Sequence, residues 1–372
     1  MGKRTDFLYL NEADTIRAGV LDARRCVSVS EEVFRLLGEG DFLMGGAKGS
    51  SHGLGLVFPK SSPFPNMPLA GPDRRFAAMP AYLGGRFDVC GNKWYGSNAA
   101  NTGKGLPRSV LTLVLNDKET GEPIGFLSAN LLSAARTGAV PAVAARHLAH
   151  REATRCTAIG CGPINRACLE AIATQMQCKE LLCIDLFEEK AEAFADWARR
   201  TLGVKAAVTD NLEEAVRFGE VISVAASRLK PLHLEDAWIQ PGATVLLTGP
   251  AQADEAFWLN TKIVYDYIGL HESYVEDAIA SGNKAGYYGG VIGGPLYNLI
   301  DAGKLPPLHE STDLGQIILG QKSGREKDDE RITFVACGMA VFDVAWGKDV
   351  YDTAQEKGIG QKLMLWDSPC QA

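Results

Sequence analysis

A glycine-rich turn between two short apolar runs is the part of this sequence best suited to chemistry. The segment 154–185 holds an apolar run, then Gly160, Cys161 and Gly162, a helix-period stretch, and a second apolar run closed by Asp185. The first glycine permits a tight turn, and the second lets the backbone approach a pyrophosphate at the positive N-terminus of the helix. A carboxylate after the second run can accept hydrogen bonds from ribose hydroxyls. This order predicts a dinucleotide-binding βαβ unit.

One position departs from the full dinucleotide fingerprint, because Asn165 stands where its third glycine is expected. A glycine pair alone also occurs in ordinary turns, but here a strand, a helix and a terminal acid accompany it. No arginine follows Asp185, so nothing at that position favours a 2′-phosphate. We therefore expect NAD as the cofactor, with NADP disfavoured.

One cation falls on a strand face that the pattern otherwise fills with apolar side chains. Lys93 alternates with Phe87 and Val89, and a buried ammonium needs an anion nearby or loses its proton. A lysine at a strand end that reaches water fits the same sequence equally well.

Arg136 raises the same question on a helix, where it shares a face with Leu132 and Val140. Its planar guanidinium can grip a carboxylate with two hydrogen bonds, although an internal ion pair is the commoner use of such an arginine. Pro141 is expected to break or restart this helix. Together, the inward lysine and arginine indicate a small anionic substrate.

Composition limits the class of protein. The 372 residues suffice for two domains with separate cores, and a net charge of −7 argues against a nucleic-acid surface. No apolar stretch approaches the ~18 residues that span a bilayer, and the N-terminus lacks the apolar core of a signal peptide. Nine cysteines without a CxxC pair indicate reduced thiols in a cytoplasmic protein.

Metal binding is not expected from the histidines. Of the six, His147 and His150 lie close in sequence, and no nearby cluster of Cys, Asp or Glu completes a tetrahedral site. We interpret these two as surface histidines at a helix end.

From about residue 150 to 330 the pattern alternates between short apolar strands and amphipathic helices. This alternation is typical of parallel strands with helices on both faces, with ligands at the carboxyl ends of the strands. The strands are expected at 154–159, 181–184, 205–210, 221–227, 243–249 and 262–267.

The N-terminal region has a different pattern and predicts a second, α+β domain. Residues 44–75 are rich in Gly, Ser and Pro and are expected to form an irregular excursion. The segment 109–129 predicts two antiparallel strands around a Lys-Glu-Thr-Gly turn. The segment from 333 begins as a strand, becomes a helix, and is expected to return to this domain.

With these features the sequence resembles the ornithine cyclodeaminase/μ-crystallin family over nearly the whole chain. The resemblance implies a Rossmann-type parallel-sheet domain at 133–332 that binds NAD(P). It also implies an α+β domain built from both chain ends, 1–132 and 333–372, that binds substrate and forms a homodimer. The markers are Met79-Pro80, the Lys93 strand, TGEP at 120–123, Arg136-Thr137, the turn at 160–162 and FVACGMAVFD at 334–343.

The resemblance further implies roles for single residues. Arg136, assisted by Lys60, would hold the α-carboxylate of the substrate. Met79 would line the substrate pocket, and Lys93 would act beside the reacting α-carbon; Asp254 is a further candidate acid or base. The nucleotide is expected to contact Gly160, Gly162, Pro163, Ile164, Asp185, Ser227 and Gly338.

Several residues differ from the family pattern and argue against a cyclodeaminase. Pro250 stands near the position where cyclodeaminases carry an aspartate, and Asp254 matches it only with a shifted alignment. Ala77 replaces the acid that would contact a distal amine, and Ile164 replaces a glutamine. We expect an NAD-dependent oxidoreductase acting at the α-carbon of an amino or imino acid. The alternatives are a diamino acid cyclodeaminase and a non-catalytic nucleotide-binding protein like the crystallins.

Overall fold

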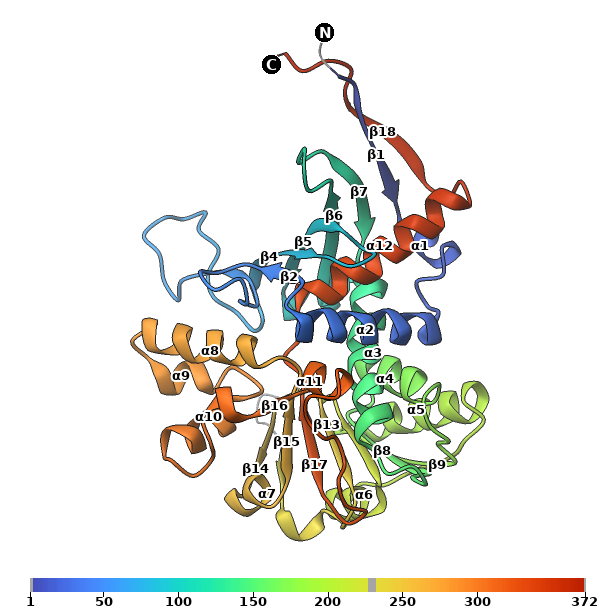
Figure 1. Ribbon diagram of the computed structural model, residues 1–372, viewed down its shortest axis with the longest axis vertical. Coiled ribbons are helices and arrows are strands. Elements are labelled where there is room, and N and C mark those ends of the chain that lie inside the picture. Colours follow the sequence, from blue (N-terminus) through green and yellow to red (C-terminus); the bar gives the residue numbers. More distant parts are fainter. Residues whose placement is uncertain (1–2, 227–231, 371–372) are drawn as a thin grey trace. The chain divides into compact units, whose positions relative to one another are not determined.

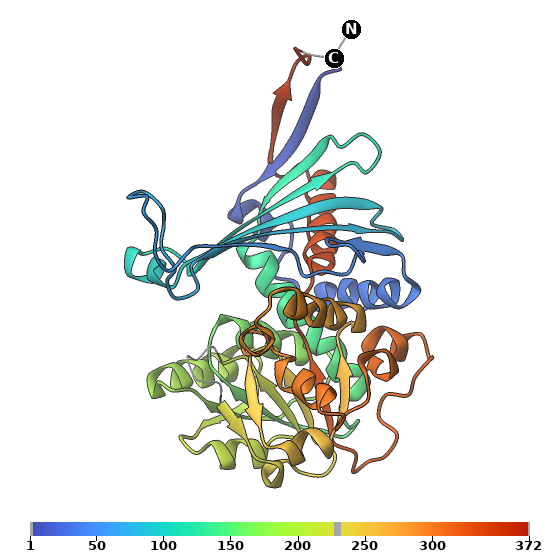
Figure 2. The ribbon, with the colours of Figure 1, turned by 90° about the vertical axis from the view of Figure 1, so that its left-hand side faces the viewer.

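The computed structural model describes residues 3–226 and 232–370. The chain divides into two compact units, shown in Figures 1 and 2. The terminal unit comprises Met1–Asp22, Gly40–Ser133 and Met339–Ala372, and the Rossmann unit comprises Ala23–Glu39 and Ala134–Gly338. One sheet is entirely parallel in its described pairs and the other mostly antiparallel, which confirms the expected α/β fold class.

The terminal unit is built on an eight-stranded sheet with the strand order β18-β1-β7-β6-β5-β4-β2, in which β3 also pairs with β4. Strands β1 and β7 run parallel, and the expected hairpin of β6 and β7 is antiparallel. The strands are β1 (Thr5–Leu10), β2 (Phe42–Met44), β3 (Leu54–Val57), β4 (Arg75–Leu83), β5 (Val89–Ser97), β6 (Ser109–Asn116), β7 (Pro123–Ser128) and β18 (Gln361–Trp366). The helices are α1 (Glu12–Arg17), the 3-10 helix η1 (Ala99–Lys104) and α12 (Ala340–Glu356).

Helix α12 covers one face of this sheet, packing on β4, β5 and β6 (Figure 2, red helix). Glycines allow the close approach. A Cβ added at Gly91 would lie 2.9 Å from Cγ2 of Val344, and one added at Gly347 would lie 2.1 Å from Cδ2 of Leu113. The two chain ends meet at the sheet edge, where β1 and β18 pair antiparallel (Figure 1).

The Rossmann unit holds the parallel sheet, in the order β10-β9-β8-β11-β13-β17-β15-β16. Its central strands are buried throughout, which explains why they read as continuous apolar runs. The strands are β8 (Arg155–Ile159), β9 (Glu180–Ile184), β10 (Lys205–Val208), β11 (Val221–Val224), β13 (Thr244–Leu247), β15 (Lys262–Tyr265), β16 (Thr312–Asp313) and β17 (Ile332–Val335). A separate pair is formed by β12 (Leu232–Leu234) and β14 (Ala251–Ala253).

Two helices precede these parallel strands in the chain, and the remaining helices lie between them, as the sequence pattern predicts. The helices are α2 (Ala23–Glu39), α3 (Asn130–Leu148), α4 (Pro163–Ile172), α5 (Glu188–Thr201), α6 (Leu212–Phe218), α7 (Glu255–Leu259), α8 (Ile268–Ala280), α9 (Lys284–Tyr288), α10 (Gly294–Asp301) and α11 (Leu314–Ile318), with the 3-10 helices η2 (Asp236–Trp238) and η3 (Leu308–Glu310). Within the described ranges, no helix combines the length and the apolar character needed to cross a bilayer.

The unit boundaries differ from the sequence expectation in two places. Strand β17 is inserted between β13 and β15 of the parallel sheet, so the chain leaves the Rossmann unit after Gly338 rather than at residue 333. Helix α2 belongs to the Rossmann unit although it is flanked by segments of the terminal unit. Its apolar face packs on α11 so closely that a Cβ at Gly315 would lie 2.7 Å from the carbonyl oxygen of Phe34.

The expectation that Pro141 breaks its helix is wrong. Helix α3 runs from Asn130 to Leu148 with Pro141 inside it. A proline removes one helix hydrogen bond, but the residues on both sides are completely or almost completely buried, including Val140 and Ala142. Packing therefore holds the helix through the proline.

Candidate nucleotide and substrate sites

The turn after β8 has the geometry that a dinucleotide requires. Gly160 adopts φ +89°, and a Cβ there would lie 2.7 Å from Cα of Ala226, two residues after β11. Both the left-handed backbone and the close strand approach therefore demand glycine. Gly162 is the N-cap of α4, and around it a Cβ would meet no described atom within 4 Å. The backbone here is open to a ligand at a helix N-terminus.

Asp185 closes the other side of this turn from the carboxyl end of β9. Its Oδ2 accepts a hydrogen bond from the N–H of Cys161 at 2.7 Å, and its Oδ1 accepts one from the N–H of Phe187 at 3.1 Å. The carboxylate is half-buried, so it is fixed by backbone donors and still accessible. That is the placement expected for an acceptor of ribose hydroxyls.

Asn165 explains how the turn forms without a third glycine. Its side chain is fully buried, and Nδ2 donates to the carbonyl oxygens of Gly160 at 2.8 Å and Ser223 at 3.2 Å. Its Oδ1 accepts a hydrogen bond from Oγ of Ser223 at 2.6 Å. These hydrogen bonds connect the first turn of α4 to the glycine loop and to β11. In the full dinucleotide fingerprint, a third glycine would allow this contact by close packing.

The start of α4 completes the candidate nucleotide site. Pro163 occupies its first turn, where a missing N–H costs nothing, and Ile164 follows half-buried. A hydrogen bond with Cys183 and burial raise the pKa of the Cys161 thiol, so the turn carries no thiolate charge. All nine cysteines are free thiols. Ser227, the other expected contact, lies outside the described residues.

In the terminal unit, Lys93 is a buried cation with a defined partner. It lies in the middle of β5, and its Nζ is 2.7 Å from Oδ2 of Asp343 on α12. The exposed fractions of the two side chains are 2% and 0%. The alternative of a lysine at a strand end reaching water is therefore excluded. Each charge compensates the other, because an isolated buried charge is strongly unfavourable.

Met79 lies directly opposite Lys93 in the pairing of β4 with β5. Two residues earlier on the same face, Ala77 lies opposite Tyr95. Met79 is buried, whereas Ala77 and Tyr95 are partly exposed. This strip of the sheet therefore presents Lys93 among apolar and aromatic side chains, and the small Ala77 lies on the same face.

In the Rossmann unit, Arg136 and Gly338 are neighbours. Arg136 lies on α3 with 6% of its surface exposed. Gly338 follows β17 at φ +78°, and a Cβ added to it would lie 3.1 Å from Nη1 of Arg136. A side chain at position 338 would thus crowd the guanidinium.

Two other expected site residues are placed less favourably. Lys60 is exposed on the loop between β3 and β4. Asp254 does not lie at the ligand edge of the sheet. Its Oδ1 accepts from the N–H of Asp236, whose carboxylate pairs with Arg331 at 2.9 Å, directly before β17. That is the amino end of the strand, whereas ligands bind at carboxyl ends. Asp254 thus has the contacts of a structural carboxylate, and its role as an acid or base stays a prediction.

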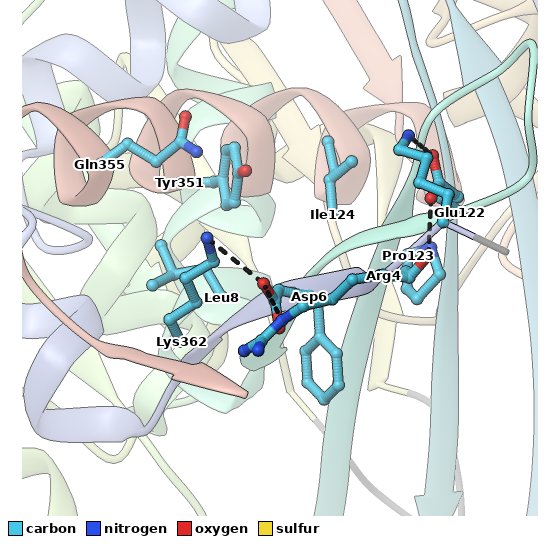
Figure 3. Close-up of a pocket in the computed structure, with 12 residues that line it drawn as sticks. Arg4, Asp6, Leu8, Glu122, Pro123, Ile124, Tyr351, Gln355 and Lys362 are labelled. Atoms are coloured by element: carbon cyan, nitrogen blue, oxygen red, sulfur yellow. Dashed lines mark hydrogen bonds and ion pairs between the residues drawn. The ribbon is translucent and has the colours of Figure 1, made fainter. Parts of the chain in front are cut away.

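A pocket of about 420 Å³ lies at the chain ends of the terminal unit (Figure 3). Figure 3 shows Asp6 beside Arg4 and Lys362, with ion-pair distances of 3.0 and 3.4 Å. Glu122 similarly pairs with Lys3 at 2.8 Å. Each cation that lines this pocket therefore has a carboxylate partner within it.

Two buried carboxylates were not expected from the sequence. Asp343 is an acid among Val341, Phe342 and Val344 on a helix, and that contrast was its signal. Asp266 ends β15 as Asp185 ends β9 and accepts hydrogen bonds from the N–H groups of Cys337 and Gly338. Within the described part of the chain, no group of three or more His, Cys, Asp or Glu side chains could hold a metal ion.

Comparison with known proteins extends this description. The ornithine cyclodeaminase/mu-crystallin family model matches residues 20–358. N-((2S)-2-amino-2-carboxyethyl)-L-glutamate dehydrogenase of Staphylococcus aureus is 31% identical over 78% of this chain and 82% of its own length. Delta(1)-pyrroline-2-carboxylate reductase of Bacillus thuringiensis is 30% identical over 68% of this chain and 73% of its own.

A solved structure agrees over a greater length. An archaeal alanine dehydrogenase dimer with bound NAD has a TM-score of 0.78 and 26% identity, covering 97% of this chain and 100% of the other. The residues matched by the family model include the glycine turn, the Lys93 strand and helix α3. This chain belongs to the ornithine cyclodeaminase/mu-crystallin family.

Proposed function

We propose that this protein is an NAD-dependent oxidoreductase that acts at the α-carbon of an amino acid or the corresponding imino acid. The observation that carries the proposal is the open glycine turn, with Gly160 and Gly162 at the N-terminus of α4 and Asp185 fastened across it. The dehydrogenases and the reductase among the relatives support the reaction class.

The residues of the turn fit NAD. Space beside Gly162 would admit the pyrophosphate, the first turn of α4 would supply N–H donors, and Asp185 would accept from the ribose. Pro163, Ile164 and Gly338 are proposed as further contacts on the same edge of the sheet. When bound, the nicotinamide would supply the hydride chemistry.

The protein's own residues would bind and orient the substrate. Arg136 is proposed to hold the α-carboxylate with its planar guanidinium, with Lys60 assisting. Lys93, paired with Asp343 in the interior, is proposed to polarise an imine or exchange a proton with the substrate nitrogen. Met79, on the same strand face, is proposed to contact the substrate side chain.

Oxidoreduction is favoured over cyclodeamination because two positions lack the acid that cyclodeamination would use. Ala77 offers no carboxylate to a distal amine, and Pro250 stands where an acid would assist loss of ammonia. These residues suit an amino acid whose side chain is uncharged.

The test is incubation of the protein with NAD⁺ and a panel of amino acids, recording NADH absorbance and ammonia in the same wells. The reverse reaction uses NADH with keto acids plus amines, and with cyclic imino acids. Net NADH formation or consumption with an amino or imino acid supports the proposal. Ammonia release without net NADH would instead identify a cyclodeaminase, and nucleotide binding without turnover would identify a crystallin-like binding protein.

A matched variant links the reaction to the proposed site. Arg136→Ala should raise KM for the carboxylate substrate by about 100-fold, because a bidentate charged contact is lost. An unchanged KM would remove Arg136 from the site.

We also propose that the terminal unit forms a homodimer. On the sheet face opposite Lys93, the rings of Phe76 and Trp94 stack with their centres 5.5 Å apart. Val110 lies on the same face, and all three side chains are exposed. An apolar sheet face of this kind is typical of a protein interface. Sedimentation should give twice the chain mass, and Trp94→Glu should give the monomer mass; a monomeric parent would contradict the proposal.

A further inference from the structure

A buried hydrogen-bond network at the carboxyl end of β15 has no part in the function proposed above. It consists of Asp266, directly after β15, His271 on α8 and Tyr297 on α10. At most 1% of each side chain is exposed. Polar groups this deeply buried are unfavourable unless they are bonded, so their arrangement needs an explanation.

His271 connects the other two side chains. Its Nε2 lies 2.9 Å from Oδ1 of Asp266, and its Nδ1 lies 2.6 Å from the hydroxyl oxygen of Tyr297. Oδ1 of Asp266 is the hydrogen-bond acceptor of this pair, so the N–H at Nε2 of His271 donates the hydrogen bond to it. The imidazole thereby orients the carboxylate, and Tyr297 orients the imidazole.

The carboxylate of Asp266 holds the turn that follows β17. Its Oδ2 accepts from the N–H of Cys337 at 2.7 Å and from the N–H of Gly338 at 3.2 Å. Strands β15 and β17 are paired neighbours, with Tyr265 opposite Val335. The side chain leaving one strand is therefore at the right height to bind the backbone leaving the other.

This turn is packed against the guanidinium of Arg136. Gly338 adopts φ +78°, and the space on its Cβ side is taken by Nη1 of Arg136 at 3.1 Å. A shift of the turn would therefore move or release the guanidinium. The contacts run without a break from Tyr297 through His271 and Asp266 to the turn and Arg136.

We propose that Asp266, oriented by His271 and Tyr297, is a positioning residue that fixes the Cys337–Gly338 turn and thereby the guanidinium of Arg136. The inference rests on the proposed function in one respect, because that function assigns Arg136 to the substrate carboxylate. Asp266 itself touches neither substrate nor cofactor in this proposal.

The test compares Asp266→Asn and Tyr297→Phe with Tyr265→Phe. Tyr265 is an apt control because it is also a buried tyrosine whose ring contacts His271, at 4.5 Å between ring centres, while the hydroxyl bonded to the imidazole belongs to Tyr297. Two readouts need no turnover: hydrogen exchange of the Cys337 and Gly338 amides, and the rate at which phenylglyoxal modifies Arg136, both by mass spectrometry. The third readout is KM, measured also in an Arg136→Ala background.

Asp266→Asn should speed exchange of the two amides and modification of Arg136 by about tenfold or more, because hydrogen bonds to a charged group are weakened. It should raise KM about tenfold in the parent background, and by no further factor when Arg136 is absent. Tyr297→Phe should act in the same direction by about threefold, and Tyr265→Phe should change nothing.

Unchanged exchange in Asp266→Asn would overturn the inference, as would an equal rise of KM with and without Arg136. If Asp266→Asn does not fold, Tyr297→Phe decides by the same criteria. A parent without any turnover would overturn the proposed function alone, because exchange and Arg136 modification still decide the positioning role.

Discussion

The glycine turn of the Rossmann unit and the Lys93–Asp343 pair of the terminal unit differ in the sequence separation of the residues that form them. In the turn, Asp185 accepts from the N–H of Cys161, 24 residues away. In the pair, 250 residues separate the two side chains. The turn is one contiguous strand-turn-helix-strand segment, so its chemistry can be inferred from local order. The pair exists only because α12 returns to the sheet from the far end of the chain.

The largest expected effect breaks the long-range pair. Asp343→Leu leaves the Lys93 ammonium buried without its carboxylate and should lower the free energy of unfolding by about 3–5 kcal/mol. The double variant Lys93→Met with Asp343→Leu should regain most of that stability without regaining activity, because no buried charge remains. Urea denaturation measures the stability of both variants.

The control for this prediction lies on the same helix. Asp352 pairs with Lys348 at 2.7 Å, but the pair is partly exposed, so Asp352→Asn should cost at most about 1 kcal/mol. A double variant no more stable than Asp343→Leu would show that the pair matters through packing rather than charge.

A smaller effect is expected from breaking the local turn. Gly160→Ala combines a left-handed backbone, which costs about 1–2 kcal/mol, with a clash against the backbone of Ala226. NADH binding, followed by nicotinamide fluorescence, should be lost together with about 2 kcal/mol or more of stability.

Gly203 provides the matched glycine. It has φ +69°, but a Cβ there meets no described atom within 4 Å. Gly203→Ala should therefore show the backbone cost alone and keep NADH binding. Equal NADH affinity in Gly160→Ala and the parent would contradict the assigned nucleotide site.

The same distinction between local and long-range contacts decides what could be predicted from the sequence. The parallel strands, the GxG turn and Asp185 could be inferred because each depends on neighbouring residues. The partner of Lys93, the insertion of β17 between β13 and β15, and the attachment of α2 to the Rossmann unit could not. These depend on which distant surfaces meet, and a single sequence does not encode that in its local pattern.

Asn165, which replaces the third glycine of the fingerprint, provides a further test of the local turn. Asn165→Gly restores the third glycine but removes buried hydrogen bonds to Gly160 and Ser223. Stability should fall by about 1–2 kcal/mol while NADH binding persists, because the turn itself remains. Ser223→Ala should show a smaller loss. If a folded Asn165→Gly variant no longer bound NADH, the site would depend on the side chain of Asn165 rather than on the glycine pair.

The smallest effect concerns the attachment of α2. The carboxylate of Glu31 is 2.7 Å from Nε2 of His147 on α3, and this hydrogen bond, with the charge of Arg146, holds the pKa of Glu31 below its usual value of 4.5. A depressed acid pKa gives stability that is present above pH 4.5 and lost as the pH falls through the folded-state value. Glu31→Gln should therefore cost up to about 1 kcal/mol at pH 7 and nothing at the acid end. Urea denaturation at pH 7 and at a pH below the folded-state pKa of Glu31 measures this cost. Glu39→Gln, at an exposed position on the same helix, is the control. An equal cost at both pH values would show that the contribution of Glu31 does not come from its ionised carboxylate.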